Sequence, residues 1–206
     1  HSQVNPAFPD MSQPEPIAQN LSELIQRVTE DGASVGLAFD GDADRLGVVD
    51  ENGRFITTLE VFSILALYML QEQGKRGPIV KGVTSSIMLN KLAEKFGVDV
   101  HEMQVGFKFI GPQMTLVDAL IGGEESGGFA FRGHIPERDG ILSGLLFLEY
   151  MARTGRSPSQ LINHLFNEVG QHYYHRRDVE FDLGDRQRID GLLAVDKLRE
   201  LAGMQV

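Results

Sequence analysis

The chain has 206 residues, of which 42% are hydrophobic and 23% charged, as is typical of a globular protein with one large or two small domains. Its formal net charge of -10 argues against a general nucleic-acid surface, because nucleic-acid phosphates are bound by clustered lysine and arginine. The absence of cysteine excludes disulfides and thiolate metal sites, and we expect a cytoplasmic protein.

The first part of the chain predicts helices and strands around an acidic loop. Proline-rich residues 5–16 are typical of an extended surface segment. Apolar spacing and turn residues then predict a helix over 17–32, strands over 34–39 and 46–50, a hairpin turn over 51–54 and a helix over 59–74. The apolar part of that last helix, residues 61–70, is too short to span a membrane, so no membrane association is expected.

The remainder of the chain continues the alternation of strands and helices. The expected elements are a strand over 78–83, a helix over 86–97, a strand over 98–103, a weak helix at best over 109–118, a strand over 119–123, a helix over 141–155, a helix beginning at Ser157 and Pro158, a strand over 172–184 and a surface helix over 185–204. Such alternation indicates an α/β protein.

Two segments of the chain share one order of elements. Residues 37–74 and 119–155 each read as a buried strand, an acidic glycine-containing loop, a short strand, a connection and an apolar helix ending in glycine. This repetition predicts two related α/β domains with a boundary near residues 55–59. The first copy lacks the front half of such a domain, so we expect the sequence to be part of a longer polypeptide.

The acidic loop places Asp40, Asp42 and Asp44 at alternate positions, which share one face in an extended chain. Three carboxylates without cysteine or nearby histidine favour a hard cation such as Mg²⁺ or Ca²⁺. An EF-hand is rejected, because Arg45 occupies the position that needs glycine and the flanking residues predict strands. A polar turn that pairs its carboxylates with Arg45 and lysines is the other interpretation, and the metal site is favoured.

The sequence GGEESGG, residues 122–128, surrounds two glutamates and a serine with glycines, which permit close approach of a ligand. Glu124 and Ser126 alternate, so they are predicted to point the same way and to bind hydroxyl groups of a polyol. A solvated hairpin is the alternative.

Several basic residues are further candidates. Lys81 and Lys108 each lie inside an apolar stretch, where a lysine needs a partner unless its amine reaches the surface, and both interpretations stay open. His134 and Arg138 come just before a predicted helix, where Asp139 can serve as the helix cap. The histidines of residues 172–177 are explained by alternation on an edge strand.

Taken in order, GLAFDGDADRLGVVDENG, VGFKFIG, GGEESGG and PERDGILSGLLFLEYMA resemble the α-D-phosphohexomutase family, which comprises phosphoglucomutases and phosphomannomutases. The resemblance implies three-layer α/β/α units with small mixed sheets. It further implies that residues 1–55 are the C-terminal half of the second family domain, residues 56–168 the third domain, and residues 169–206 the connection towards a C-terminal domain.

The resemblance also implies a reaction, which interconverts hexose 1-phosphate and hexose 6-phosphate through a phosphoserine and a 1,6-bisphosphate, with glucose and mannose phosphates fitting equally. The implied roles are Mg²⁺ binding by Asp40, Asp42 and Asp44, a place beside the transferring phosphate for Arg45, hydroxyl recognition by Glu124 and Ser126, positive or proton-transferring groups at Lys108 and Lys81, and substrate contacts by His134 and Arg138.

Two family motifs have no counterpart in this sequence: the serine nucleophile and the C-terminal phosphate loop. We therefore expect the isolated chain to bind Mg²⁺ weakly and to lack mutase turnover, its partners being hexose phosphates and the missing domains of the same polypeptide. One alternative is a non-catalytic module that binds Mg²⁺ or sugar phosphate. Another is a phosphatase in which Asp40 is the nucleophile and Asp42 the acid/base.

Overall fold

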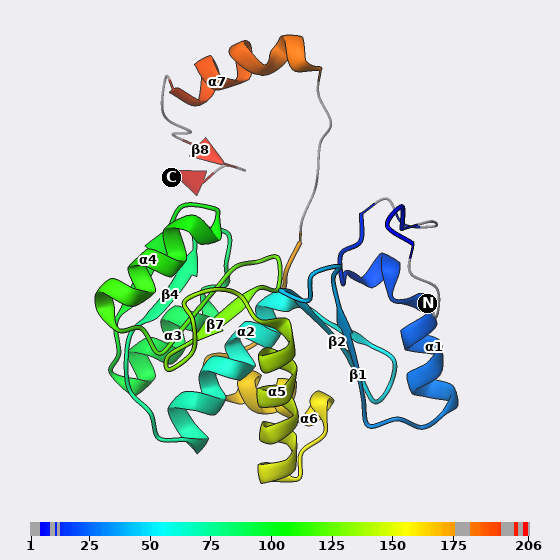
Figure 1. Cartoon of the computed structure of the whole chain (residues 1–206). Coiled ribbons are helices and arrows are strands. Elements are labelled where there is room, and N and C mark those ends of the chain that lie inside the picture. The colour runs from blue at the N-terminus through cyan, green and yellow to red at the C-terminus, as the bar shows by residue number, and fades with distance from the viewer. Residues whose placement is uncertain are drawn as a thin grey trace. The chain divides into compact units, whose positions relative to one another are not determined.

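The computed structural model describes residues 5–8, 11, 13–175, 182–194, 200–201 and 204–205. The chain divides into one unit over residues 1–172 and a second over residues 173–206. In the first unit, helices cover both faces of two small β-sheets, and one group of helices lies between the sheets (Figure 1). The second unit contains η3 (Leu183–Asp185), α7 (Arg186–Ala194) and the paired strands β8 (Glu200–Leu201) and β9 (Met204–Gln205).

The first sheet is antiparallel, with strand order β1-β2-β3. Its strands are β1 (Val35–Phe39), β2 (Leu46–Asp50) and the two-residue β3 (Phe55–Ile56). The turn η1 (Ala18–Asn20) leads into α1 (Ser22–Glu30), which covers one face of this sheet (Figure 1). Alternation explains the packing, since the side chain of Val49 faces α1 and joins Leu21 and Val28 in a small apolar cluster.

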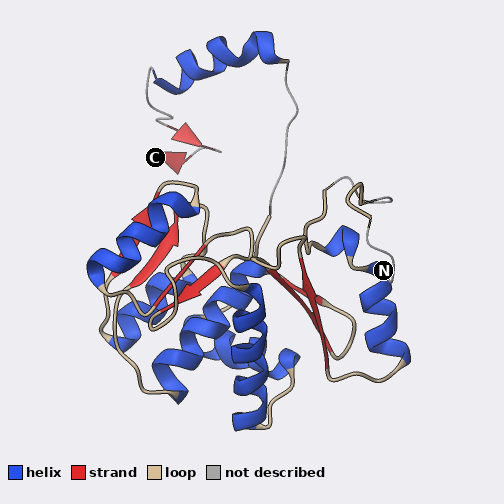
Figure 2. Cartoon of the chain, in the orientation of Figure 1, coloured by secondary structure: helices blue, strands red, loops and turns tan. Residues whose placement is uncertain are grey.

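The second sheet is mixed, with strand order β5-β4-β6-β7. Strand β4 (Ile79–Gly82) runs parallel to β5 (Val100–Met103) and β6 (Ile121–Gly123), and β6 pairs antiparallel with β7 (Phe129–Phe131). Helix α4 (Phe107–Val117) packs on β4, β5 and β6, and α3 (Met88–Phe96) also contacts β5. Figure 2 shows the strands of both sheets in red, each flanked by helices.

The helices between the sheets belong to both halves of the first unit. They are α2 (Thr58–Leu67), its π-helical extension η2 (Tyr68–Glu72), α5 (Gly140–Thr154) and α6 (Pro158–Val169). Thr57 and Glu60 form a capping box at the start of α2, and Asp139 caps α5 by accepting a hydrogen bond from the Leu142 amide. The main apolar core includes Val48 of the first sheet, Phe129 of the second and buried residues of these helices.

These observations confirm the expected α/β class and the small mixed sheet. They also correct two expectations. Residues 107–117 form a full α-helix rather than a weak one. The residues expected to form one strand over 172–184 have no strand where they are described, at 172–175 and 182–184, and residues 176–181 lie outside the described part.

The expected single helix over 185–204 is wrong, because α7 covers Arg186–Ala194 and residues 200–201 and 204–205 are strands, while residues 195–199 and 202–203 lie outside the described part. Among the helices described here, none has both the length and the apolarity needed to cross a membrane.

The turn between β2 and β3 is fastened to the start of α6 by one carboxylate. Glu51 accepts hydrogen bonds from the Ser157 hydroxyl at 2.6 Å, from the Ser159 amide at 3.2 Å and from the Ser159 hydroxyl. Burial acts to raise the pKa of Glu51, but these hydrogen bonds outweigh it and the pKa lies below its ordinary value.

We expect Glu51→Gln to lower the free energy of unfolding by about 1–2 kcal/mol at pH 7, since hydrogen bonds to a charged group are the stronger ones. Because the pKa of Glu51 is lower in the folded state, this stabilisation is present above the unfolded pKa and is lost as the pH falls through the folded value. Urea unfolding at pH 7 and at acidic pH measures both effects. A difference between the two proteins that stays constant down to the lowest pH would contradict this account.

Candidate functional site

The aspartate loop, residues 40–45, connects β1 to β2. The Ala43 amide donates to the Asp40 carbonyl at 3.2 Å, and Ala43 has a positive φ of 60°, so the loop is a tight turn. The expectation of an extended chain is therefore wrong for these residues, because the hairpin reverses direction here. The turn nevertheless gathers the predicted side chains, and one carboxylate oxygen from each of Asp40, Asp42 and Asp44 lies within 4.8 Å of the others.

Asp40 is the most enclosed of the three carboxylates, with its side chain only 2% exposed. Its Oδ1 accepts from the Arg45 amide at 3.1 Å, and its Oδ2 accepts from Arg45 Nε at 2.6 Å. Burial acts to raise the pKa of Asp40, but the hydrogen bonds from Arg45 prevail and lower it. Asp40 is thus a fixed anion, and Arg45 is held between it and Glu15, whose Oε1 is 2.6 Å from Arg45 Nη1.

Asp44 has one oxygen engaged and the other without a hydrogen bond. Its Oδ2 lies 2.6 Å from Arg138 Nη2, whereas Oδ1 is buried and has no hydrogen-bond partner. Burial raises the pKa of Asp44 to about 6, with the neighbouring carboxylates adding to the rise and Arg138 opposing it. Arg45 Nε lies 3.6 Å from this Oδ1, beyond hydrogen-bond distance, so the oxygen has an ionic neighbour and still has lone pairs available for a cation.

The three carboxylates fit a hard divalent cation. They offer only oxygen ligands, which Mg²⁺ and Ca²⁺ prefer, and a cation among them would satisfy Asp44 Oδ1. Asp42 is exposed and no ion pair involves it in the described residues, so it is available as a third ligand. The flanking strands β1 and β2 agree with the rejection of an EF-hand, whose loop lies between helices.

The glutamate loop, residues 124–128, connects β6 to β7 in the same manner. The Gly127 amide donates to the Glu124 carbonyl at 3.2 Å, which closes a tight turn with Glu125 and Ser126 at its centre. Strand alternation therefore does not orient Glu124 and Ser126, contrary to the argument from sequence. Ser126 is exposed, whereas Glu124 is 13% exposed and its Oε1 accepts from the Gly106 amide at 3.1 Å.

The two loops meet through their backbones. Arg45 and Gly128 form an antiparallel bridge, and the Leu46 amide donates to the Gly127 carbonyl at 3.0 Å. The first amide of α5, at Gly140, donates to the Ala43 carbonyl at 3.0 Å. The aspartate loop is thus held by residues that follow it by more than eighty positions in the sequence.

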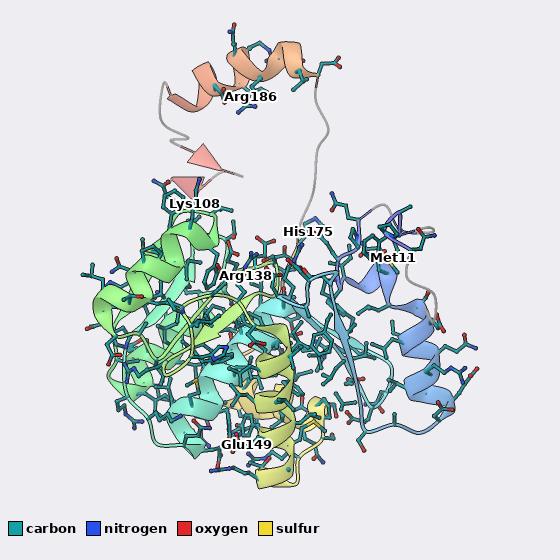
Figure 3. All side chains as sticks on the ribbon, viewed as in Figure 1. Met11, Lys108, Arg138, Glu149, His175 and Arg186 are labelled. Atoms are coloured by element: carbon teal, nitrogen blue, oxygen red, sulfur yellow. The ribbon has the colours of Figure 1, made fainter. Side chains whose placement is uncertain are left out.

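Arg138 joins the side chains of the two loops. Besides its 2.6 Å contact with Asp44, its Nη1 lies 3.7 Å from Glu124 Oε2. Its guanidinium also lies over the Phe107 ring, 5.6 Å from the ring centroid. Figure 3 labels Arg138 between the two sheets and Lys108 at the start of α4, apart from it.

The two candidate lysines have different environments. Lys81 is 3% exposed, and its Nζ lies 2.9 Å from Glu102 Oε2, so it is a buried lysine with a partner. It stands opposite Gly123 in the register of β4 and β6, beside the start of the glutamate loop. Lys108 is exposed with its Nζ 5.0 Å from the centroid of the Phe109 ring, and no ion pair joins it to either loop in the described residues.

His134 lies at the rim of this region. It is exposed, and its Nε2 is 3.0 Å from Asp139 Oδ2, while Asp139 Oδ1 accepts from the Leu142 amide. The helix-capping interpretation of Asp139 is therefore confirmed.

The contributors to the site that were missed from sequence include Glu15, Glu102, Gly106, Phe107 and Gly140. Glu15 belongs to the proline-rich segment that was interpreted as surface, and its separation of 30 residues from Arg45 gives no local signal. Glu102 could have been found, because it occupies the third position of β5 and Lys81 occupies the third position of the neighbouring β4.

Comparison with known proteins assigns both parts of the chain to one protein family. Residues 59–169 match the family model described as phosphoglucomutase/phosphomannomutase, alpha/beta/alpha domain III, and residues 1–53 match domain II of the same family. These matches define a protein built from α/β/α domains of the sugar-phosphate mutase type. The chain belongs to the phosphoglucomutase/phosphomannomutase family, and the resemblance expected from its motifs is confirmed.

Individual relatives support the same family assignment. The chain is 35% identical over 189 residues to a phosphoglucomutase/phosphomannomutase from Thermococcus kodakarensis, a match that covers 92% of this chain and 39% of the relative. It is 40% identical over 140 residues to a phosphoglucosamine mutase from Moorella thermoacetica, covering 67% of this chain and 31% of that protein. A phosphoglucomutase/phosphomannomutase family protein from Burkholderia thailandensis superposes with a TM-score of 0.71 at 28% identity, over 79% of this chain and 35% of that one. The chain thus spans about a third of the length of these relatives.

Proposed function

We propose that this chain supplies the magnesium loop and the sugar-recognition loop of a phosphohexomutase. The complete polypeptide would interconvert hexose 1-phosphate and hexose 6-phosphate through a phosphoserine and a 1,6-bisphosphate, the phosphoserine lying outside this sequence. Family membership supports this proposal, as do the names of the relatives, which are hexose-phosphate and hexosamine-phosphate mutases.

One observation carries the proposal: Arg138 joins the cluster of three aspartates to the partly buried Glu124. Asp44 and Glu124 lie in different hairpins and both lie within 4 Å of the Arg138 guanidinium. A cation at the aspartate loop and a hydroxyl group at Glu124 would therefore be close neighbours. This arrangement is what transfer of a phosphoryl group to a sugar hydroxyl requires.

The residues take distinct roles in this proposal. Asp40, Asp42 and Asp44 hold Mg²⁺, which when bound supplies positive charge that stabilises a phosphoryl oxygen. Arg45, fixed by Asp40 and Glu15, presents its remaining donors toward a phosphate. Glu124 accepts from a sugar hydroxyl.

The remaining candidates have roles outside the cation cluster in this proposal. Ser126 at the loop tip and the exposed His134 contact the substrate from the rim. Lys81, held by Glu102, adds positive charge beneath the glutamate loop, and Lys108 reaches the substrate from the first turn of α4. Lys108 then needs to turn away from Phe109 when substrate is present.

We further propose the division of the chain. Residues 1–55 form the C-terminal half of the second family domain, residues 56–168 form the third domain, and residues 169–206 lead towards a C-terminal domain. The family-model matches over 1–53 and 59–169 support this division.

The aspartate phosphatase is less well supported. Its nucleophile would be Asp40, whose side chain is 2% exposed and whose two oxygens both accept hydrogen bonds from Arg45. Hydrogen bonds from Arg45 to both oxygens weaken Asp40 as a nucleophile, whereas each oxygen keeps a second lone pair with which it can ligate a cation. Beryllium fluoride should therefore form no adduct at Asp40.

We expect this chain alone to bind Mg²⁺ but to show no mutase turnover, because it lacks the family's serine motif. Isothermal titration calorimetry with MgCl₂ measures the first property. A coupled assay with glucose 1-phosphate, glucose 1,6-bisphosphate and Mg²⁺ measures the second. Absence of Mg²⁺ binding would contradict the proposed site. Interconversion of the glucose phosphates by the chain alone would contradict the proposal that the phosphoserine lies outside this sequence.

A further inference from the structure

The Arg138 side chain lies between the two loops, and its Nε is also 3.3 Å from Oε1 of the neighbouring Glu137. Its guanidinium contacts Asp44 in the aspartate loop, lies 3.7 Å from Glu124 in the glutamate loop, and covers the Phe107 ring at the start of α4. The side chain is 29% exposed, so most of it is enclosed by these neighbours.

Gly128 makes this position possible. A Cβ atom at Gly128 would lie 2.3 Å from Arg138 Cδ and 2.7 Å from its Cγ, far inside van der Waals contact. The aliphatic part of Arg138 therefore crosses the glutamate loop directly over the Gly128 backbone. Gly128 also forms the backbone bridge to Arg45. Gly128 therefore has two roles: its backbone joins the two loops, and its lack of a side chain leaves room for Arg138, which joins their side chains.

Arg138 and Arg45 contact different oxygens of Asp44, and Arg138 makes the shorter contact. Arg138 Nη2 engages Oδ2, and the oxygen left without a hydrogen bond is Oδ1. A partner that fixes one oxygen of a ligating carboxylate orients the other toward the metal, and removal of such partners typically weakens metal binding.

We propose that Arg138 is a positioning residue that couples the two loops, so that cation binding at Asp40, Asp42 and Asp44 and ligand binding at Glu124 are energetically linked. This inference rests on the proposed function, since it requires the aspartate loop to bind a cation. A cation that fixes Asp44 also fixes the guanidinium, and the guanidinium restrains Glu124. By thermodynamic reciprocity, a ligand that fixes Glu124 strengthens cation binding by the same factor.

The first test is the Mg²⁺ affinity of Arg138→Met, measured by titration calorimetry on the chain. Methionine keeps much of the aliphatic stem and removes the guanidinium, and we expect about tenfold weaker binding, as for other groups that orient metal ligands. Arg132→Met is the matched control, because Arg132 pairs with Asp118 and the Arg76 carbonyl, and it should bind Mg²⁺ like the wild type. Equal affinities of Arg138→Met and the wild type would overturn the coupling.

Gly128→Ala provides a test that leaves every charge in place. The added Cβ displaces the Arg138 side chain, and we expect Mg²⁺ binding to weaken in the same direction as in Arg138→Met. Circular dichroism melting of each variant establishes that it is folded. Wild-type affinity in a folded Gly128→Ala protein would count against the role of Arg138.

Hydrogen exchange supplies a readout at the second loop. In the wild type, Mg²⁺ should slow amide exchange across residues 124–128, and this slowing should be absent in Arg138→Met even at saturating Mg²⁺. Slowing that persists in the variant overturns the coupling while leaving the cation site intact. A wild-type chain that binds no Mg²⁺ overturns the proposed function and this inference together, so the two failures are distinguishable.

Discussion

Asp42→Asn is expected to weaken Mg²⁺ binding by at least about tenfold, because affinity for divalent cations depends on the number of charged oxygen ligands. Asp42 is the most suitable of the three aspartates for this experiment. Asp40 and Asp44 are each paired with a partly buried arginine, so their substitution would also remove an ion pair that holds the loop. Asp42 is exposed and makes no such pair in the described residues.

The fold should be unaffected by Asp42→Asn, with a change in the free energy of unfolding within about 0.5 kcal/mol, as for most surface substitutions. Asp99→Asn is a matched control, because Asp99 is also exposed but precedes β5, away from the aspartate loop. Mg²⁺ titration calorimetry and urea unfolding of the three proteins separate the two effects. Undiminished Mg²⁺ affinity in Asp42→Asn would show that the cation binds elsewhere.

Gly140→Ala is expected to destabilise the chain by about 1–3 kcal/mol, the usual range for overpacking a well-packed site. A Cβ at this position would lie 2.7 Å from the Arg45 carbonyl oxygen and 2.8 Å from the Ala43 carbonyl oxygen. Both are backbone atoms of a tight turn, so they cannot move aside as a flexible side chain can. The start of α5 must shift instead, and the hydrogen bond from the Gly140 amide to Ala43 is lost or lengthened.

The same helix offers a matched control in Gly144→Ala. Its Cβ would approach only side-chain atoms, the nearest being Leu37 Cδ1 at 3.3 Å, and alanine favours helix over glycine by about 1 kcal/mol. We therefore expect Gly144→Ala to be neutral or slightly stabilising in urea unfolding, and to bind Mg²⁺ normally. Gly140→Ala should bind Mg²⁺ more weakly, because the aspartate loop loses its support. Equal stability of the two variants would contradict this view of the junction.

The sequence predicted those parts of the site that depend on residues close to one another in the chain. Asp139 was recognisable as a helix cap from its position before an apolar helix, and the three aspartates from their spacing. The three aspartates are grouped as predicted, but by a geometry different from the one expected. Residues two apart share a face in a strand, but here it is the reversal of the chain between β1 and β2 that gathers the carboxylates.

Helix α4 shows why propensity alone underestimated the structure. Pro112 lies inside it and lacks an amide hydrogen, which lowers helix propensity. Tertiary packing overcomes this cost, because Ile110 and Met114 are buried against the second sheet. Gly122 allows this close approach, since a Cβ there would lie 2.2 Å from the Met114 sulfur. A glycine in one element thus stabilises a helix in another, and no window of sequence around α4 contains that information.

The junction between the loops was also beyond local reasoning. Arg138 was a weak candidate from its place before a helix, and nothing near it in sequence indicated Asp44 or Glu124 as partners. Its position depends on the backbone bridge between Arg45 and Gly128, which forms only when the two hairpins are brought together.

The layer of helices between the two sheets has a consequence for protein engineering. Helices α2, α5 and α6 all contact β2, although the family models divide the chain between residues 53 and 59. A recombination crossover at that division would join the first sheet of one parent to helices of another. Chimaeras with related mutases should therefore fold well only if β2 and the helix faces that contact it come from the same parent. The borders of the family domains thus differ from the borders of the group of residues that pack together.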